Sequence, residues 1–151
     1  MSNLRDQFHT CLLHAAAALG RALTRMADEH FGRVGLSPTM AFILLSTKEA
    51  QGISLTELAI IHRLDRSTIS RAVDKLAADQ FVERSGEGRD VRVFLTPKGT
   101  RKAADAMAAW KKVQLDYTLL LSQGESQFLA ERVARADNVL RENGLGAMER
   151  S

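Results

Sequence analysis

The chain has 151 residues, of which 45% are hydrophobic and 26% charged, a composition typical of a globular protein with one core. A net charge of +3 permits a polyanionic partner without requiring one. The single cysteine excludes an internal disulfide, and no apolar run reaches the roughly 18 residues that a membrane helix needs. Since the first residues do not have the pattern of a secretory signal, we expect a cytoplasmic protein.

The first part of the chain has the periodicity of a helix. Apolar residues fall at alternating steps of three and four between Leu4 and Met26, as on the face of a helix that packs against other helices. This pattern predicts one long helix over residues 4–31, with Cys11 on its apolar face. Gly32 and Gly35 then end it.

Capping residues predict where the next two helices begin. Ser37 is a suitable N-cap and Pro38 suits the first helical position, so a second helix should run to about residue 50. Ser54 and Glu57 have the spacing of a capping box, which predicts a third, short helix ending near residue 62.

A fourth helix is expected over residues 66–79 with Asp65 as its N-cap. Ile69, Val73 and Leu76 are spaced to face a core. Two short strands, 81–84 and 91–95, should then form a hairpin around a glycine-containing turn. Thr96 and Ser122 are expected to cap two further helices, over residues 97–121 and 123–143, with no domain break between them.

The third and fourth predicted helices, joined by a tight connection, have the form of a helix-turn-helix. The second helix of such a motif enters the DNA major groove N-terminus first, so residues 66–71 would meet phosphates or base edges. Arg71 is our first candidate for reading a base, because arginine binds the guanine edge with two hydrogen bonds. The alternative is a polar, solvated surface of an ordinary helix. The candidate DNA-binding side chains are Ser54, Thr56, Arg66, Ser67, Thr68, Ser70, Arg71, Lys75 and Arg92.

The sequence resembles the MarR family of bacterial regulators over nearly its whole length. The resemblance is carried by LTELA at 55–59, LDRSTISR at 64–71, FVER at 81–84 and LTPKG at 95–99. It implies one mainly α-helical domain over 1–151 with a small β-hairpin wing. Within it, the resemblance implies a winged helix-turn-helix core at 36–99, a connecting helix at 97–121, and dimerisation helices at 1–35 and 122–151.

The resemblance also assigns a role to the wing. An acidic residue, any residue and an arginine precede the Leu-Thr-x-x-Gly pattern in this family, and Glu87 and Arg89 fit this spacing, with Glu87 in place of the more usual aspartate. Arg89 would then enter the minor groove. Only Ser85 and Gly86 separate Arg84 from Glu87, so the wing should be shorter than in many relatives and reach less far.

The function implied by the resemblance is a ligand-responsive transcriptional repressor that binds a pseudo-palindromic operator in double-stranded DNA as a homodimer. The effector would be a small aromatic or phenolic compound, for which Trp110 and Met107 are candidate contacts, although both also suit an ordinary core. Cys11 is similar in position to the reactive cysteine of the family's peroxide-sensing branch, but no lysine or arginine is adjacent to it in the sequence.

No grouping of nucleophile, base and acid and no phosphate-binding glycine loop is present in the sequence. We therefore expect no enzyme, no cofactor and no metal site. The alternative function is a winged-helix module that docks on a protein without specific DNA binding, because winged helices serve both purposes.

Overall fold

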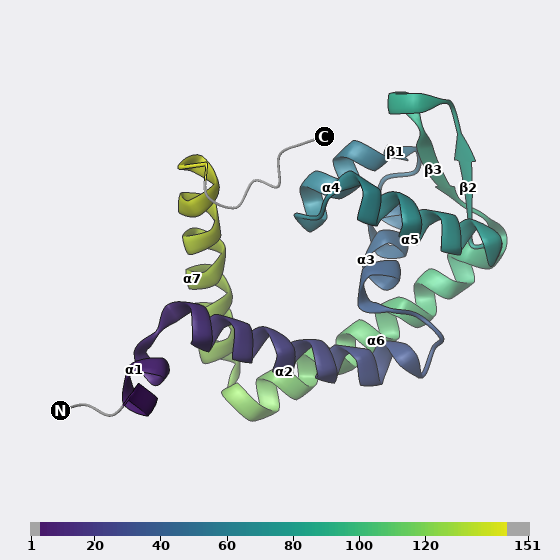
Figure 1. The fold of residues 1–151 in the computed structure, drawn as a ribbon. Coiled ribbons are helices and arrows are strands. Elements are labelled where there is room, and N and C mark those ends of the chain that lie inside the picture. Colours follow the sequence, from purple (N-terminus) through teal and green to yellow (C-terminus); the bar gives the residue numbers. More distant parts are fainter. Residues whose placement is uncertain (1–3, 145–151) are drawn as a thin grey trace.

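The computed structural model describes residues 4–144, which form helices and one small antiparallel sheet (Figure 1). This confirms the prediction of a mainly helical fold with a β-hairpin. The elements in chain order are α1 (Leu4–Thr10), α2 (Leu12–Gly32), α3 (Pro38–Glu49), β1 (Ile53–Ser54), α4 (Leu55–His62), α5 (Arg66–Ala78), β2 (Val82–Ser85), the short 3-10 helix η1 (Gly88–Asp90), β3 (Arg92–Leu95), α6 (Pro97–Leu121) and α7 (Gln123–Glu142).

The prediction of one long first helix was wrong, because the chain breaks at Cys11 between α1 and α2. Cys11 has extended backbone angles (φ −79°, ψ 117°) and is exposed, so it does not lie on an apolar helix face. The break allows the rings of Phe8 and His14 to stack with their centroids 5.6 Å apart. Residues six apart point to different sides of a continuous helix and could not meet in this way.

The predicted helix starts are confirmed by hydrogen bonds from the capping side chains. Ser54 Oγ accepts from the Glu57 backbone N–H at 3.1 Å, and the Glu57 carboxylate accepts from the Ser54 N–H at 2.8 Å, which completes the capping box at α4. Similar single caps begin α3, α5, α6 and α7. At α7 the Glu125 carboxylate accepts from the hydroxyl of Ser122.

The sheet contains a third strand that was not predicted. β3 lies in the centre, with β2 on one side and the two-residue β1 on the other, and both neighbours are antiparallel to it. Ile53 pairs with Val93, and both are buried. A two-residue strand is too short to show the alternation that identifies strands in a sequence. Its pairing joins the start of α4 to the part of β3 nearest the wing turn.

The core lies where α2, α3 and β3 pack on α6, and where α4 and α5 pack on each other and on α3. Phe31, Leu44, Leu58 and Val93 are among its fully buried side chains. Gly99, in the first turn of α6, lies so close to the hairpin that a Cβ there would be 1.7 Å from the Phe81 carbonyl oxygen. Any larger residue would clash here, which explains why the LTPKG motif has a glycine at this position.

Helix α7 is placed differently from the other long helices. It follows the end of α6 that lies away from the hairpin, on the same side of the molecule as α1, and stands apart from α3, α4 and α5 (Figure 1). None of its residues is buried. None of the described helices is long and apolar enough to cross a membrane.

Candidate nucleic-acid interface

The start of α5 is held by a compact set of hydrogen bonds to Asp65. Its carboxylate accepts from the Thr68 backbone N–H at 2.7 Å, from the Thr68 hydroxyl at 2.5 Å, and from the Ser67 hydroxyl. These bonds, led by the one from Ser67, hold the pKa of Asp65 far below its usual value. Because Ser67 and Thr68 each donate their one hydroxyl proton to Asp65, neither hydroxyl can donate to a phosphate unless it first leaves the cap.

Arg71 is the predicted base-reading residue, and it lies one turn after this cap. Its Nη2 donates to Thr68 Oγ1 at 3.3 Å, so Asp65, Thr68 and Arg71 form a chain of hydrogen bonds along the exposed side of α5. The Arg71 side chain is exposed. This arrangement directs a guanidinium along the N-terminal half of α5, where a recognition helix meets DNA.

Arg66 links α5 to the wing, because its Nη2 donates to the Gly88 carbonyl oxygen at 2.7 Å. The space between the helix and the hairpin is a concave surface of about 540 Å³. Its lining combines cations and hydroxyls from α5 with residues from α4 and the wing, namely Leu55, Arg66, Ser67, Ser70, Arg71, Arg84 and Gly88.

Arg84 is the member of this surface that the sequence analysis missed. It lies on β2 opposite Val93 and forms an ion pair with Asp74 of α5. Its position just before the wing turn is a signal that could have identified it. Reading that signal required knowing that this side of the hairpin faces α5.

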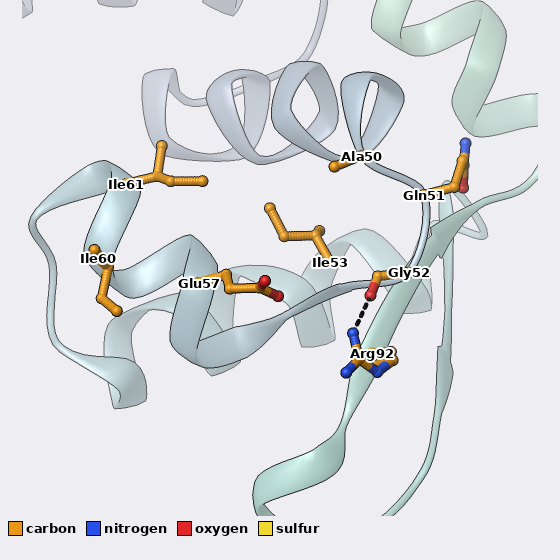
Figure 2. A pocket seen from close by; sticks show the side chains of 8 residues that line it. All are labelled: Ala50, Gln51, Gly52, Ile53, Glu57, Ile60, Ile61 and Arg92. Atoms are coloured by element: carbon orange, nitrogen blue, oxygen red, sulfur yellow. Dashed lines mark hydrogen bonds between the residues drawn. The ribbon is translucent and has the colours of Figure 1, made fainter.

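Arg92 lies apart from the α5 side chains that line this concave surface, on the central strand β3. Its Nη1 donates to the Gly52 carbonyl oxygen at 2.9 Å, and the side chain borders a separate pocket of about 410 Å³ with Glu57, Ile60 and Ile61 (Figure 2). Hydrogen bonds from Ser54, and to a lesser extent the charge of Arg92, hold the pKa of Glu57 below its usual value. The guanidinium of Arg92 therefore links β3 to the segment that leads into β1 and α4.

The remaining predicted DNA-binding residues are spread around α4, α5 and the wing. The hydroxyl of Ser54 takes part in the capping box, and Thr56 is exposed in the first turn of α4. Lys75 is exposed on α5, beyond Arg71. Arg89 belongs to η1, but its side chain is outside the described part of the structure, so its groove contact stays a prediction.

Two side chains at the end of α4, those of His62 and the C-cap residue Arg63, make contacts elsewhere. His62 Nε2 is 3.0 Å from Ser46 Oγ, and its ring stacks on Phe42 of α3. Burial lowers the pKa of His62. Arg63 instead reaches α7, where it forms an ion pair with Asp137 and donates from Nη2 to Asn138 Oδ1 at 3.0 Å.

Comparison with known proteins agrees with this geometry. Residues 36–94, which include α3, the helix-turn-helix and the wing, match the sequence model of the MarR family. This segment therefore has the sequence pattern of the MarR family. The HTH-type transcriptional repressor MdtR of Bacillus subtilis (strain 168) is 24% identical over 123 residues, which cover 80% of this chain and 79% of MdtR.

Two solved structures show that the MarR fold extends beyond the matched segment. The transcriptional repressor CouR, bound to p-coumaroyl-CoA, superposes with a TM-score of 0.76 at 20% identity and covers 85% of this chain and 92% of CouR. A mutant of MarR from E. coli, complexed with operator DNA, superposes with a TM-score of 0.75 at 19% identity. The match covers 89% of this chain and 99% of the MarR chain. The family assignment made from the sequence motifs is confirmed.

A second cavity, of about 480 Å³, lies between α2, α6 and α7. Its wall is mainly apolar, with the polar groups of Arg63, Gln114 and Tyr117 among the lining residues. Neither Trp110 nor Met107, the predicted ligand contacts, is among its lining residues, and Trp110 packs against the core. On α6 the lining side chains lie one to three turns further along, at Gln114, Tyr117 and Leu121.

Proposed function

We propose that this chain is a sequence-specific DNA-binding transcriptional regulator, and that α5 and the wing are its DNA-contacting elements. The observation that carries the proposal is the concave surface between them, which gathers Arg66, Arg71 and Arg84 beside the capped start of α5. Cations and helix N-terminal amides are the groups that bind phosphate oxygens, and an exposed arginine can read a guanine edge.

This surface favours DNA over a protein partner. A helix that docks in the groove of a protein partner presents an apolar face, whereas the lining from α5 consists of arginine and serine side chains. The match to the MarR family model and the likeness to a repressor support the same choice. The proposal places the protein in the cytoplasm, where it meets the chromosome, and assigns it no catalytic activity.

The protein would act as a homodimer through its terminal helices. Most of the large, exposed apolar side chains lie on α1, α2, α6 and α7, with Leu13 79% and Leu119 73% exposed. An apolar surface of this extent on a soluble protein usually marks an interface. Two-fold symmetry would also present two copies of α5 to two half-sites of a pseudo-palindromic operator.

The cavity between α2, α6 and α7 is the proposed effector site. Its volume suits a small aromatic or phenolic compound, and the apolar wall with a few polar groups is typical of ligand pockets. CouR was solved bound to p-coumaroyl-CoA, which supports this choice of compound. A panel of phenolic carboxylates tests it by the rise in melting temperature and the release of operator DNA, and the Tyr117→Leu variant should lose both responses.

The experiment that tests DNA binding selects fragments of the host genome that the purified protein retains. We expect a defined fragment containing an inverted repeat to be enriched. Its affinity should fall steeply as salt rises, because each phosphate contact releases condensed counterions. Retention of genomic and random DNA with equal affinity, or no retention near physiological salt, would contradict the proposal.

A further inference from the structure

Arg63 occupies a backbone position that does not favour an arginine. Its φ of 52° and ψ of 40° are left-handed, and its N–H closes the end of α4 by bonding to the carbonyls of Ala59 and Ile60. Glycine or asparagine takes this conformation at lower cost. The backbone therefore gives no reason for an arginine here, and the reason must lie in its side chain.

That side chain leaves the DNA-binding core and reaches the last turns of α7. Its guanidinium pairs with Asp137 and donates to Asn138 at 3.0 Å, across more than 70 positions of sequence. Asp137 also accepts from Arg141 Nε at 2.8 Å, so its carboxylate is held between two arginines. The contact thus joins the turn before the recognition helix to a helix that otherwise packs mainly on α6.

The contact is too exposed to contribute much to stability. The side chains of Arg63 and Asp137 are 41% and 35% exposed, and ion pairs as exposed as this one add little to the free energy of unfolding. The contact matters instead for the relative position of two elements. The turn is followed directly by α5, and α7 belongs to the proposed dimer surface. A link between the turn and α7 therefore restrains the movement of α5 relative to the dimer axis.

We propose that Arg63 is a positioning residue that sets the distance between the two recognition helices of the dimer. The inference rests on the proposed function, since only a dimer that reads two half-sites has such a distance to set. A restrained dimer loses less freedom on binding and discriminates against half-sites at the wrong separation. A dimer without this restraint binds half-sites at either separation with similar affinity.

The test uses the full-length dimer, the selected operator, and two operators with one and two base pairs inserted between the half-sites. Arg63→Asn keeps a residue that tolerates the left-handed conformation but is too short to reach α7. Fluorescence anisotropy should show that wild type loses affinity with each insertion. For Arg63→Asn we expect roughly fivefold weaker binding to the natural operator and a much smaller penalty for insertion.

Asp137→Asn should reproduce this effect, and the double variant should add little to either single one. Arg33→Asn is the matched control, because it breaks an exposed ion pair between the C-cap residue of α2 and Glu29 of the same helix, which links no other element. The inference is overturned if wild type prefers the natural spacing and Arg63→Asn keeps that preference. It is equally overturned if affinity falls by the same factor at all spacings. Absence of operator binding by wild type would instead overturn the proposed function.

Discussion

Arg66 Nη2 donates a hydrogen bond of 2.7 Å to the carbonyl oxygen of Gly88, and so the recognition helix holds the wing directly. Gly88 precedes Arg89, the predicted minor-groove residue, in η1. Besides its proposed contact with DNA, Arg66 would therefore hold the wing in position relative to α5.

The Arg66→Ala variant tests this use. Losing a hydrogen bond from a charged group should weaken operator binding by about 1 kcal/mol, roughly fivefold. If Arg66 acts by placing the wing, Arg89→Ala should weaken binding less in the Arg66→Ala background than in wild type. Titrations of the four proteins on one operator measure this coupling. Independent effects would show that Arg66 does not position Arg89.

Arg71→Ala should reduce the discrimination between operator and random DNA. If Arg71 makes two hydrogen bonds to a guanine edge, the loss is about 1–3 kcal/mol. Lys75→Ala is the control on the same helix, and we expect it to weaken operator and random DNA alike, as the loss of a phosphate contact does. Competition titrations give both ratios. An unchanged ratio for Arg71→Ala would assign base reading to another residue.

The parts of this structure that were predictable from sequence are those fixed by near neighbours. Ser54 and Asp65 cap helices through bonds to residues three positions away, so the pattern alone locates α4 and α5. Arg66 and Gly88 are 22 positions apart, and Arg63 reaches α7 across 74. Contacts of that kind depend on how helices pack, which short patterns do not encode.

In the candidate site, too, the features that depend on local spacing were predictable and the long-range contacts were not. The sequence identified the polar side of α5, because its spacing is local. It also gave Arg92 as a DNA-binding candidate without showing that the carbonyl of Gly52 lies beside it. Arg84 was missed because only the folded hairpin shows that it faces Asp74. The break at Cys11 was missed because the apolar periodicity continues across it.

Gly99→Ala should destabilise the fold. The added Cβ would lie 1.7 Å from the Phe81 carbonyl oxygen, so α6 or the hairpin must move, at a cost of about 3 kcal/mol or more. Gly124→Ala is the matched control, since a Cβ there meets nothing within 4 Å. We expect the control to gain up to about 1 kcal/mol, because alanine favours the helix. Urea unfolding at equal protomer concentration compares them, and equal midpoints would contradict the steric argument.

His62 should make stability sensitive to mild acid. Burial lowers its pKa in the folded protein, so between the unfolded value of about 6.5 and the lower folded value the unfolded chain binds more protons. The stabilisation is complete above the unfolded pKa and decreases as the pH falls through that window. Melting temperatures between pH 7.5 and 5.5 should therefore fall more steeply for wild type than for His62→Gln. His14→Gln, at an exposed position, should follow wild type. Parallel curves for wild type and His62→Gln would exclude this linkage.

Leu13→Glu should separate the dimer into folded monomers. Leu13 is 79% exposed at the start of α2, where it does not contribute to the core of its own chain, so a charge there should leave the helical content unchanged. Burying the same charge in an apolar interface is costly, and association should be lost at micromolar concentration. Operator affinity should fall with it, because one recognition helix then reads one half-site.

Ile60→Glu is the control, since Ile60 is 72% exposed but lies on α4, away from the proposed interface. Light scattering reports the oligomeric state. A dimer that persists in Leu13→Glu would move the interface away from the start of α2.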